Sequence, residues 1–133
     1  MINLYAKSLA SMLVLVSILI IMGPVEAKDI SQSQLQQLMK KDTQVVLLDV
    51  RTVEEFEDGH IPNALNIPHK ELEQRLVELA ESKDTQIVIY CRSGRRAEVA
   101  KQVLIKNGFN HLDHLTGDFN GWTSSELPTI KGK

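Results

Sequence analysis

The sequence has one cysteine, few aromatic residues and almost no excess of charge. With Cys91 as the only cysteine among 133 residues, no intramolecular disulfide bond can form, and any thiol chemistry depends on that sulfur. The formal net charge of −2 gives no overall basic field, so we expect no nucleic-acid partner. His69, His111 and His114 have no ligand spacing with a cysteine or carboxylate cluster, so we expect no metal site, and we expect no cofactor either. The length allows one domain rather than two.

Residues 1–27 have the three-part layout of a secretory signal. A short polar start carries Lys7, an apolar run of 14 residues follows, and Gly23-Pro24 then precedes small residues at the two positions that a signal peptidase reads. We expect cleavage after Ala27 and a periplasmic or otherwise exported domain of residues 28–133 without a stable membrane span. The alternative is a retained membrane anchor, but the apolar run is shorter than the ~20 residues that a spanning helix needs.

Strands and helices alternate through the remaining residues. The apolar runs at 44–50 and 86–90 have strand length and predict strands that are buried on both faces. Capping boxes at Ser31 and Thr52 predict the starts of two helices. In chain order we expect a helix from Ser31, a strand at 44–50, a helix from Thr52 to Gly59, a strand at 64–67, a helix at 70–82 with Leu72, Leu76, Val77, Leu79 and Ala80 facing inward, a strand at 86–90, a helix at 96–107, a strand at 111–115, a short helix around Trp122 and an irregular tail at 127–133. This alternation predicts a three-layer α/β domain, a parallel sheet with helices on both faces.

Cys91 opens a short loop between a predicted buried strand and a predicted helix. Ligands collect at the carboxyl ends of parallel strands, and a helix N-terminus adds unpaired N–H groups and partial positive charge. Three nearby arginines favour the thiolate, and Gly94 lets the loop turn its N–H groups inward around an anion. An inert buried thiol is the alternative, but burying three cations around it would be costly. We therefore expect a reactive Cys91 beside an anion-binding loop of Arg92, Ser93, Gly94, Arg95 and Arg96.

Several segments together resemble the rhodanese family over nearly all of residues 28–133. They are Asp49-Val50-Arg51 with Glu54-Glu55-Phe56, the specific run at 59–68, the loop at 91–96, Gly108-Phe109 and the closing segment at 115–122. The short exported form is similar to periplasmic single-domain sulfurtransferases of the phage-shock type. Asp118 is a departure, because the family commonly has a second glycine there. This departure concerns the geometry of the turn rather than the chemistry.

The resemblance implies a thiosulfate sulfurtransferase. Cys91 would take a sulfane sulfur from thiosulfate or a persulfide donor, become a persulfide, and pass the sulfur to cyanide or a thiol. The loop N–H groups would hold the charged sulfur, as an oxyanion hole holds negative charge. Arg92 and Arg95 would dock an anionic donor, whereas Arg96 either binds the substrate or has a structural role.

Polar residues outside the loop have structural interpretations. Asp49 and Arg51 follow the first buried strand, and we expect them to form a structural pair near the site. His60 could complete a Cys/His dyad, as in a thiol hydrolase. We expect it instead to be a turn residue, because a thiolate that attacks sulfur directly needs no general base.

Two other classes of function remain open. A cysteine-dependent phosphatase or arsenate reductase also cradles a thiolate in a loop that ends in arginine. Those enzymes place five residues between the two, whereas Cys91 and Arg96 have four between them, a smaller loop that suits sulfur better than a tetrahedral oxyanion. A non-catalytic binding module of the same fold would predict a lost cysteine or a degraded loop, and the sequence has neither.

Overall fold

The computed structural model describes residues 28–41 and 44–133, so the predicted signal at 1–27 lies outside the described residues. The elements in chain order are β1 (Lys28–Ile30), α1 (Gln32–Lys40), β2 (Val45–Asp49), α2 (Val53–Asp58), β3 (Leu65–Asn66), the 3₁₀ helices η1 (Leu72–Gln74) and η2 (Leu76–Ser82), β4 (Gln86–Tyr90), α3 (Arg95–Lys106), β5 (Leu112–Leu115) and α4 (Asp118–Ser124). None of the helices in the described ranges has the length and apolar character that crossing a membrane requires.

The five strands form one parallel sheet in the order β1-β5-β4-β2-β3. The long apolar strand β4 lies at the centre, between β2 and β5. Because every pair is parallel, the carboxyl ends of the strands meet at one edge, and the loops that follow them gather there. The edge strand β1 was not predicted, since three residues are too few to show a periodicity.

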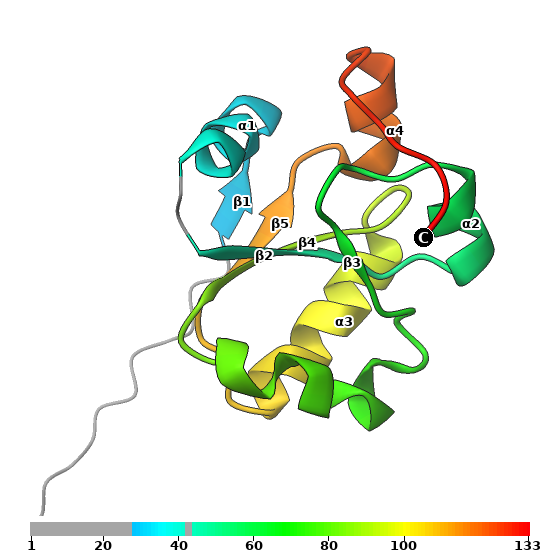
Figure 1. Ribbon diagram of the computed structural model, residues 1–133. Coiled ribbons are helices and arrows are strands. Elements are labelled where there is room, and N and C mark those ends of the chain that lie inside the picture. The colour runs from blue at the N-terminus through cyan, green and yellow to red at the C-terminus, as the bar shows by residue number, and fades with distance from the viewer. Residues whose placement is uncertain (1–27, 42–43) are drawn as a thin grey trace, which may run out of the picture.

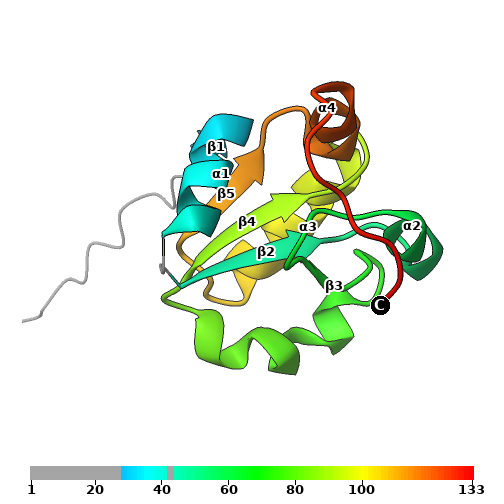
Figure 2. The same cartoon turned by 45° about the horizontal axis from the view of Figure 1, so that its top comes forward.

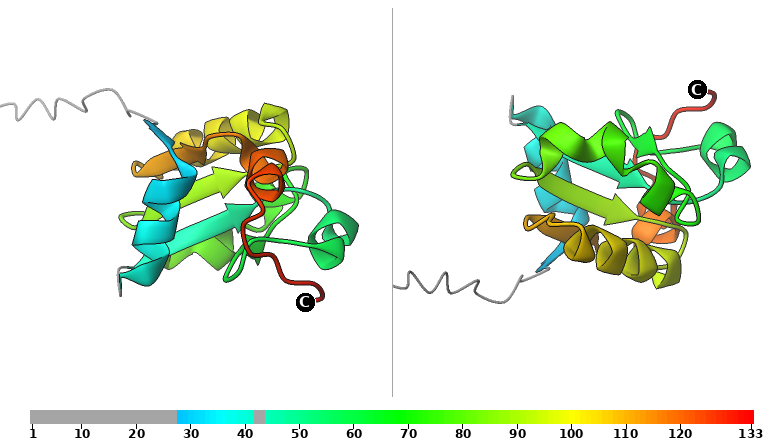
Figure 3. Two further views of the ribbon diagram at one scale, coloured as in Figure 1. Left: turned by 90° about the horizontal axis from the view of Figure 1, so that it is seen from above. Right: turned by 90° about the horizontal axis from the view of Figure 1, so that it is seen from below.

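Helices cover both faces of the sheet. Helices α1 and α4 lie over one face, while α3 and the 3₁₀ helices lie over the other (Figure 1). In Figure 3 the view from above has α1 and α4 in front of the strands, and the view from below has α3 and the 3₁₀ helices in front of them, while Figure 2 gives an intermediate view. The predicted three-layer α/β fold is therefore confirmed.

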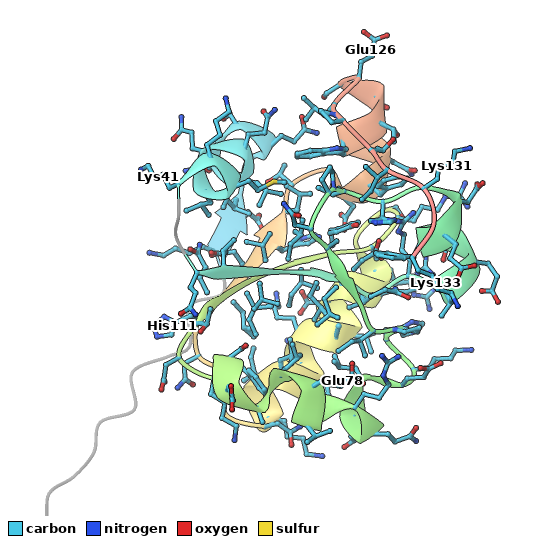
Figure 4. All side chains as sticks on the ribbon, in the orientation of Figure 1. Lys41, Glu78, His111, Glu126, Lys131 and Lys133 are labelled. Carbon is cyan, nitrogen blue, oxygen red and sulfur yellow. The ribbon has the colours of Figure 1, made fainter. Side chains whose placement is uncertain are left out.

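Alternation along the strands divides the buried side chains into two apolar cores. In β4, Ile87 and Ile89 pack with α3 and the 3₁₀ helices, while Val88 and Tyr90 belong to the cluster that contains Leu35 and Trp122. Figure 4 draws the side chains of the described residues, and the labelled Lys41, Glu126 and Lys131 lie at the periphery. Burying both faces explains why the strands at 44–50 and 86–90 read as continuous apolar runs.

The helix starts agree with the sequence, but the segment at 70–82 does not. Both capping boxes are present, with Ser31 accepting from Gln34 N–H and Thr52 from Glu55 N–H. The predicted helix at 70–82 is wrong, because the segment forms two 3₁₀ helices.

The tighter winding of a 3₁₀ helix changes which side chains of this segment face the core. With about three residues per turn, Leu76 and Leu79 share one face. Val77 is consequently 79% exposed and Ala80 is exposed, so their predicted inward orientation is also wrong.

The C-terminal tail is irregular, as predicted, but it is anchored to the domain. His60 and Ile130 exchange two backbone hydrogen bonds of 2.9 and 3.0 Å in an isolated antiparallel bridge. The indole N–H of Trp122 donates to the carbonyl of Pro128 at 2.8 Å. The tail thereby closes over α2, next to the edge where the strand ends gather (Figure 1).

Candidate active site

Cys91 directly follows the central strand β4 and is 1% exposed. The loop from Cys91 to Gly94 leads into α3, whose first residue is Arg95. Gly94 takes a left-handed φ of 112°, a conformation that strongly favours glycine. Its backbone N–H turns back and donates to Cys91 Sγ at 3.0 Å.

The sulfur therefore lies at the N-terminus of a 12-residue helix. The N–H groups in the first turn of such a helix have no acceptor within the helix, and their aligned dipoles favour an anion. A hydrogen bond to Sγ also stabilises a thiolate more than a thiol. The local backbone thus favours negative charge on this sulfur.

The first turn of α4 closes the loop from the other side. The N–H of Phe119 donates to the carbonyl of Cys91 at 2.9 Å, and the N–H of Asn120 donates to the carbonyl of Arg92 at 3.1 Å. These two hydrogen bonds fix the two peptide groups that flank Arg92.

Asp118 holds the loop with its side chain. Its buried carboxylate accepts the N–H of Cys91 at Oδ1, at 2.9 Å, and both of its oxygens lie 3.0 Å from His114 Nε2. The hydrogen bond to Asp118 raises the pKa of His114 above its usual value, while burial opposes this rise. The position was identified in the sequence only as a departure from the family's glycine. That an acid beside a histidine four residues earlier would bind the cysteine N–H was not predicted.

Arg96 is held by Glu55, a residue of α2. Its two terminal nitrogens lie 2.6 and 2.8 Å from the two carboxylate oxygens of Glu55 in a bidentate pair. The hydrogen bond from Arg96 lowers the pKa of Glu55 to about 2. Of the two roles considered for Arg96, this geometry matches the structural one.

Asp49 and Arg51 form a buried ion pair beside the loop. Arg51 Nη2 lies 2.6 Å from Asp49 Oδ2 and also donates to the carbonyl of Gly59 at 2.7 Å. The guanidinium stacks over the ring of Phe119, 3.9 Å from its centroid. The pair thus links the end of β2 to the start of α4.

His60 contacts its own turn. Its Nδ1 lies 2.8 Å from the carbonyl of Phe56, and its ring stacks on the Phe56 ring at 3.6 Å. The dyad considered for His60 has no support in these contacts.

The remaining loop side chains face solvent. Arg92, Ser93 and Arg95 are exposed, and within the described part of the chain neither guanidinium has a side-chain hydrogen bond or ion pair. Arg92 lines an open cleft of about 380 Å³ together with Phe119, Asn120, Arg51 and Asp58. Arg92 and Arg95 are therefore the two loop arginines whose charge is available to a ligand.

The fold and the site define an α/β protein whose single cysteine is held at a helix N-terminus, at the carboxyl edge of a parallel sheet. Residues 31–125 match the rhodanese-like domain. The chain belongs to the rhodanese-like family.

Three relatives indicate the kind of activity. A "Sulfurtransferase" of Allochromatium vinosum is 34% identical over 102 residues, which cover 77% of this chain and 94% of that protein. The "Thiosulfate sulfurtransferase PspE" of Escherichia coli is 31% identical over 85 residues, covering 64% of this chain and 78% of the relative. The "Putative sulfur carrier protein YrkF" of Bacillus subtilis is 38% identical over 95 residues, which are 71% of this chain but only 50% of that protein. These relatives support a sulfurtransferase.

Solved structures show the same fold. A rhodanese-related protein from Thermoplasma volcanium superposes with a TM-score of 0.68 at 27% identity, covering 77% of this chain and 97% of its own. A thiosulfate sulfurtransferase from Pseudomonas aeruginosa gives a TM-score of 0.73 at 25% identity, covering 79% of this chain and 20% of its own.

The Glu55–Arg96 pair predicts a pH-dependent stability. Because the folded-state pKa of Glu55 is depressed, its contribution is present above the unfolded-state value of ~4.3 and is lost as pH falls towards about 2. Glu55→Gln should therefore lower the free energy of unfolding at pH 7, and the difference from wild type should shrink towards pH 2. Urea denaturation across this range measures it. Glu54→Gln, an exposed neighbour on the same helix, is the matched control, and an equal loss in both variants would contradict the assignment.

Proposed function

We propose that the protein is a thiosulfate sulfurtransferase that works through a Cys91 persulfide. The main observation in support is the hydrogen bond that the Gly94 N–H donates to Cys91 Sγ at the N-terminus of α3. This arrangement directs a hydrogen bond at the attacking sulfur and leaves the helix N–H groups beside any sulfur bound to it. The exposed guanidinium groups of Arg92 and Arg95 suit an anionic donor.

The reaction balances in two displacements. The Cys91 thiolate attacks the outer sulfur of thiosulfate, a new S–S bond forms, and the old bond breaks with its electron pair leaving on sulfite. An acceptor, either cyanide or a thiolate, then attacks the outer sulfur of the persulfide, and Cys91 leaves as the thiolate. Neither displacement needs a general base, which agrees with the imidazole of the buried His60, whose Nδ1 lies 2.8 Å from the carbonyl of Phe56 in its own turn. A persulfide donor enters the same sequence in place of thiosulfate.

A function as a phosphatase or arsenate reductase has less support than sulfur transfer. In such an enzyme the loop arginine must reach the oxyanion, but Arg96 is bound to Glu55 through both of its terminal nitrogens. The Gly94 N–H is within hydrogen-bonding distance of the sulfur itself, which leaves little room for a tetrahedral group between them.

Replacement of the nucleophile is the direct test. Cys91→Ser should abolish thiosulfate:cyanide sulfurtransfer while the protein keeps its circular-dichroism spectrum, because the two side chains differ little in size. Mass spectrometry of wild type treated with thiosulfate should show a gain of one sulfur atom on Cys91. Residual activity above a tenth of wild type, in folded protein, would exclude the covalent intermediate.

The exposed arginines provide a second test. Replacing both Arg92 and Arg95 by alanine should raise the KM for thiosulfate about tenfold, ~1.4 kcal/mol of binding. The effect should be smaller with an uncharged persulfide donor, and it should weaken with added salt, which screens charges over ~10 Å at 0.1 M. Steady-state kinetics with both donors measure the difference. Equal losses with both donors would show that the arginines shape the loop rather than dock the anion.

We also propose that the protein acts in the periplasm or another exported compartment. The support is the signal-like layout of residues 1–27, a short polar start with Lys7, an apolar run and small residues before the expected cleavage site. Expression of the full chain should give a protein whose N-terminal residue is Lys28 in the soluble periplasmic fraction. Full-length protein in washed membranes would support the anchor instead.

A further inference from the structure

Asp118 adopts a backbone conformation that costs energy. Its φ is 54°, directly after Gly117 with a φ of 83°, and a side chain in this region is strained where a glycine would not be. The residue is also a carboxylate at 2% exposure. Both costs must be offset locally, and the offsetting contacts are the hydrogen bonds to Cys91 N–H and to His114.

The carboxylate and the imidazole lie directly beneath the turn that surrounds the sulfur. A Cβ atom placed on Gly94 would meet Asp118 Oδ2 at 3.1 Å and His114 Cε1 at 3.5 Å. The N–H of the same glycine donates to Cys91 Sγ. One peptide turn therefore separates the Cys91 sulfur from the acid–histidine pair.

The Asp118 carboxylate affects how readily the Cys91 sulfur carries a negative charge. A carboxylate near the sulfur opposes a second negative charge on Cys91, because two like charges in a water-poor site repel each other strongly. A protonated His114 cancels the charge of Asp118, whereas a neutral His114 leaves it in place. The proton on His114 therefore decides how well the loop tolerates an anionic sulfur.

Charged groups from three elements determine whether His114 keeps this proton. Asp118 on α4 contacts Nε2, and Asp29 on β1 lies 3.7 Å from Nδ1. On α3, the carboxylate of Glu98 and the ammonium of Lys101 act in opposite directions. The acids dominate, so the pKa of His114 lies above its usual value despite partial burial, with Asp118 as the largest cause. The imidazolium form is thus favoured in the resting protein near and below that usual value.

We propose that Asp118 and His114 are positioning residues of the sulfurtransferase site, in which Asp118 fixes the Cys91 amide and the proton on His114 keeps the charge beneath the sulfur neutral. This inference rests on the proposed function for its kinetic consequences but not for its electrostatic ones. It also explains why a residue other than glycine occupies position 118 despite the strain. The carboxylate gives the loop an acceptor that glycine lacks, and His114 removes the penalty of its charge.

The kinetic test uses a charge-balanced double variant. His114→Gln keeps a donor for Asp118 but removes the proton, and it should lower kcat/KM for sulfur transfer about tenfold, which corresponds to ~1.4 kcal/mol. The double variant H114Q/D118N removes the carboxylate charge as well and keeps an oxygen for the Cys91 N–H, so it should recover most of the activity. A structural role alone predicts no recovery. Unchanged activity in H114Q, or a double variant as slow as H114Q, would overturn the proposal.

The pH profile gives a second readout. Wild type should lose activity on the alkaline side as His114 releases its proton, and this decline should be absent in Asp118→Asn. Asp29→Asn is the matched control, because it removes the other carboxylate that faces His114 without contact to the Cys91 loop. It should move the decline to slightly lower pH and leave the maximal rate unchanged. The same alkaline decline in Asp118→Asn as in wild type would count against the proposal.

An NMR titration separates this inference from the proposed function, because it needs no sulfur transfer. The imidazole of His114 should titrate at higher pH in reduced wild type than in Cys91→Ser, since coupling between two charges is reciprocal. Equal midpoints in the two proteins would overturn the charge coupling even if the enzyme transfers sulfur. A shifted midpoint in a protein without sulfurtransferase activity would support the coupling and reject only the proposed reaction.

Discussion

The arrangement at the carboxyl edge of the sheet depends on the contacts of one buried group, the guanidinium of Arg51. It binds the Asp49 carboxylate at the end of β2, donates to the carbonyl of Gly59 where α2 ends, and stacks on Phe119 in α4. Three segments that are far apart in the sequence are thereby joined around one charge. Removing a single partner would leave the other ion buried and uncompensated, which typically costs ~3–5 kcal/mol. The position of α4, and with it the closure of the cysteine loop, follows from this contact.

Charge at the site is divided between groups that hold the backbone and groups that remain free. Glu55 pairs with Arg96, Asp49 pairs with Arg51, and Asp118 lies 3.0 Å from His114 Nε2. Each of these pairs lies at the rim or beneath the loop, and each fixes a segment that borders the sulfur. What remains for a ligand is the exposed charge of the outer arginines together with the N–H groups of the helix. The exposed positive charge beside the loop therefore comes from Arg92 and Arg95, while the arginines nearer the sheet are held by carboxylates.

The sequence predicted the features that depend on local patterns. Apolar runs identified the strands that are buried on both faces, and the capping boxes identified two helix starts, because both signals lie within a few neighbouring residues. The prediction of one helix at 70–82 was wrong because the leucine spacing of this segment suits an α-helix and a 3₁₀ helix almost equally. Tertiary packing decides between the two. Strand β1 was not predicted for a different reason. It has three residues, and it is held by its pairing with β5, which is far away in the sequence.

In the site as well, the features that are local in the sequence could be predicted, whereas the contacts between distant residues could not. The cysteine, its glycine turn and the following helix are contiguous in the sequence, and their arrangement could be inferred from it. The partners of Arg96 and of the Cys91 amide are 41 and 27 residues away, and no local pattern connects them. An unusual residue at a position that favours glycine was the one available signal for Asp118. A departure from a family pattern at a strained position is therefore worth testing for a contact that offsets the strain.

The sheet order has a consequence for how the chain matures. The first described strand pairs with the last one, so Lys28 meets Asp113, and helix α4, which follows β5 in the sequence, closes the cysteine loop. Contacts so distant along the chain form late in folding, because the loop entropy must be overcome before they contribute stability. During synthesis the nucleophile therefore emerges well before the segment that encloses it. In the folded domain Cys91 is 1% exposed, and until α4 has packed against the loop the same sulfur is more accessible to oxidants.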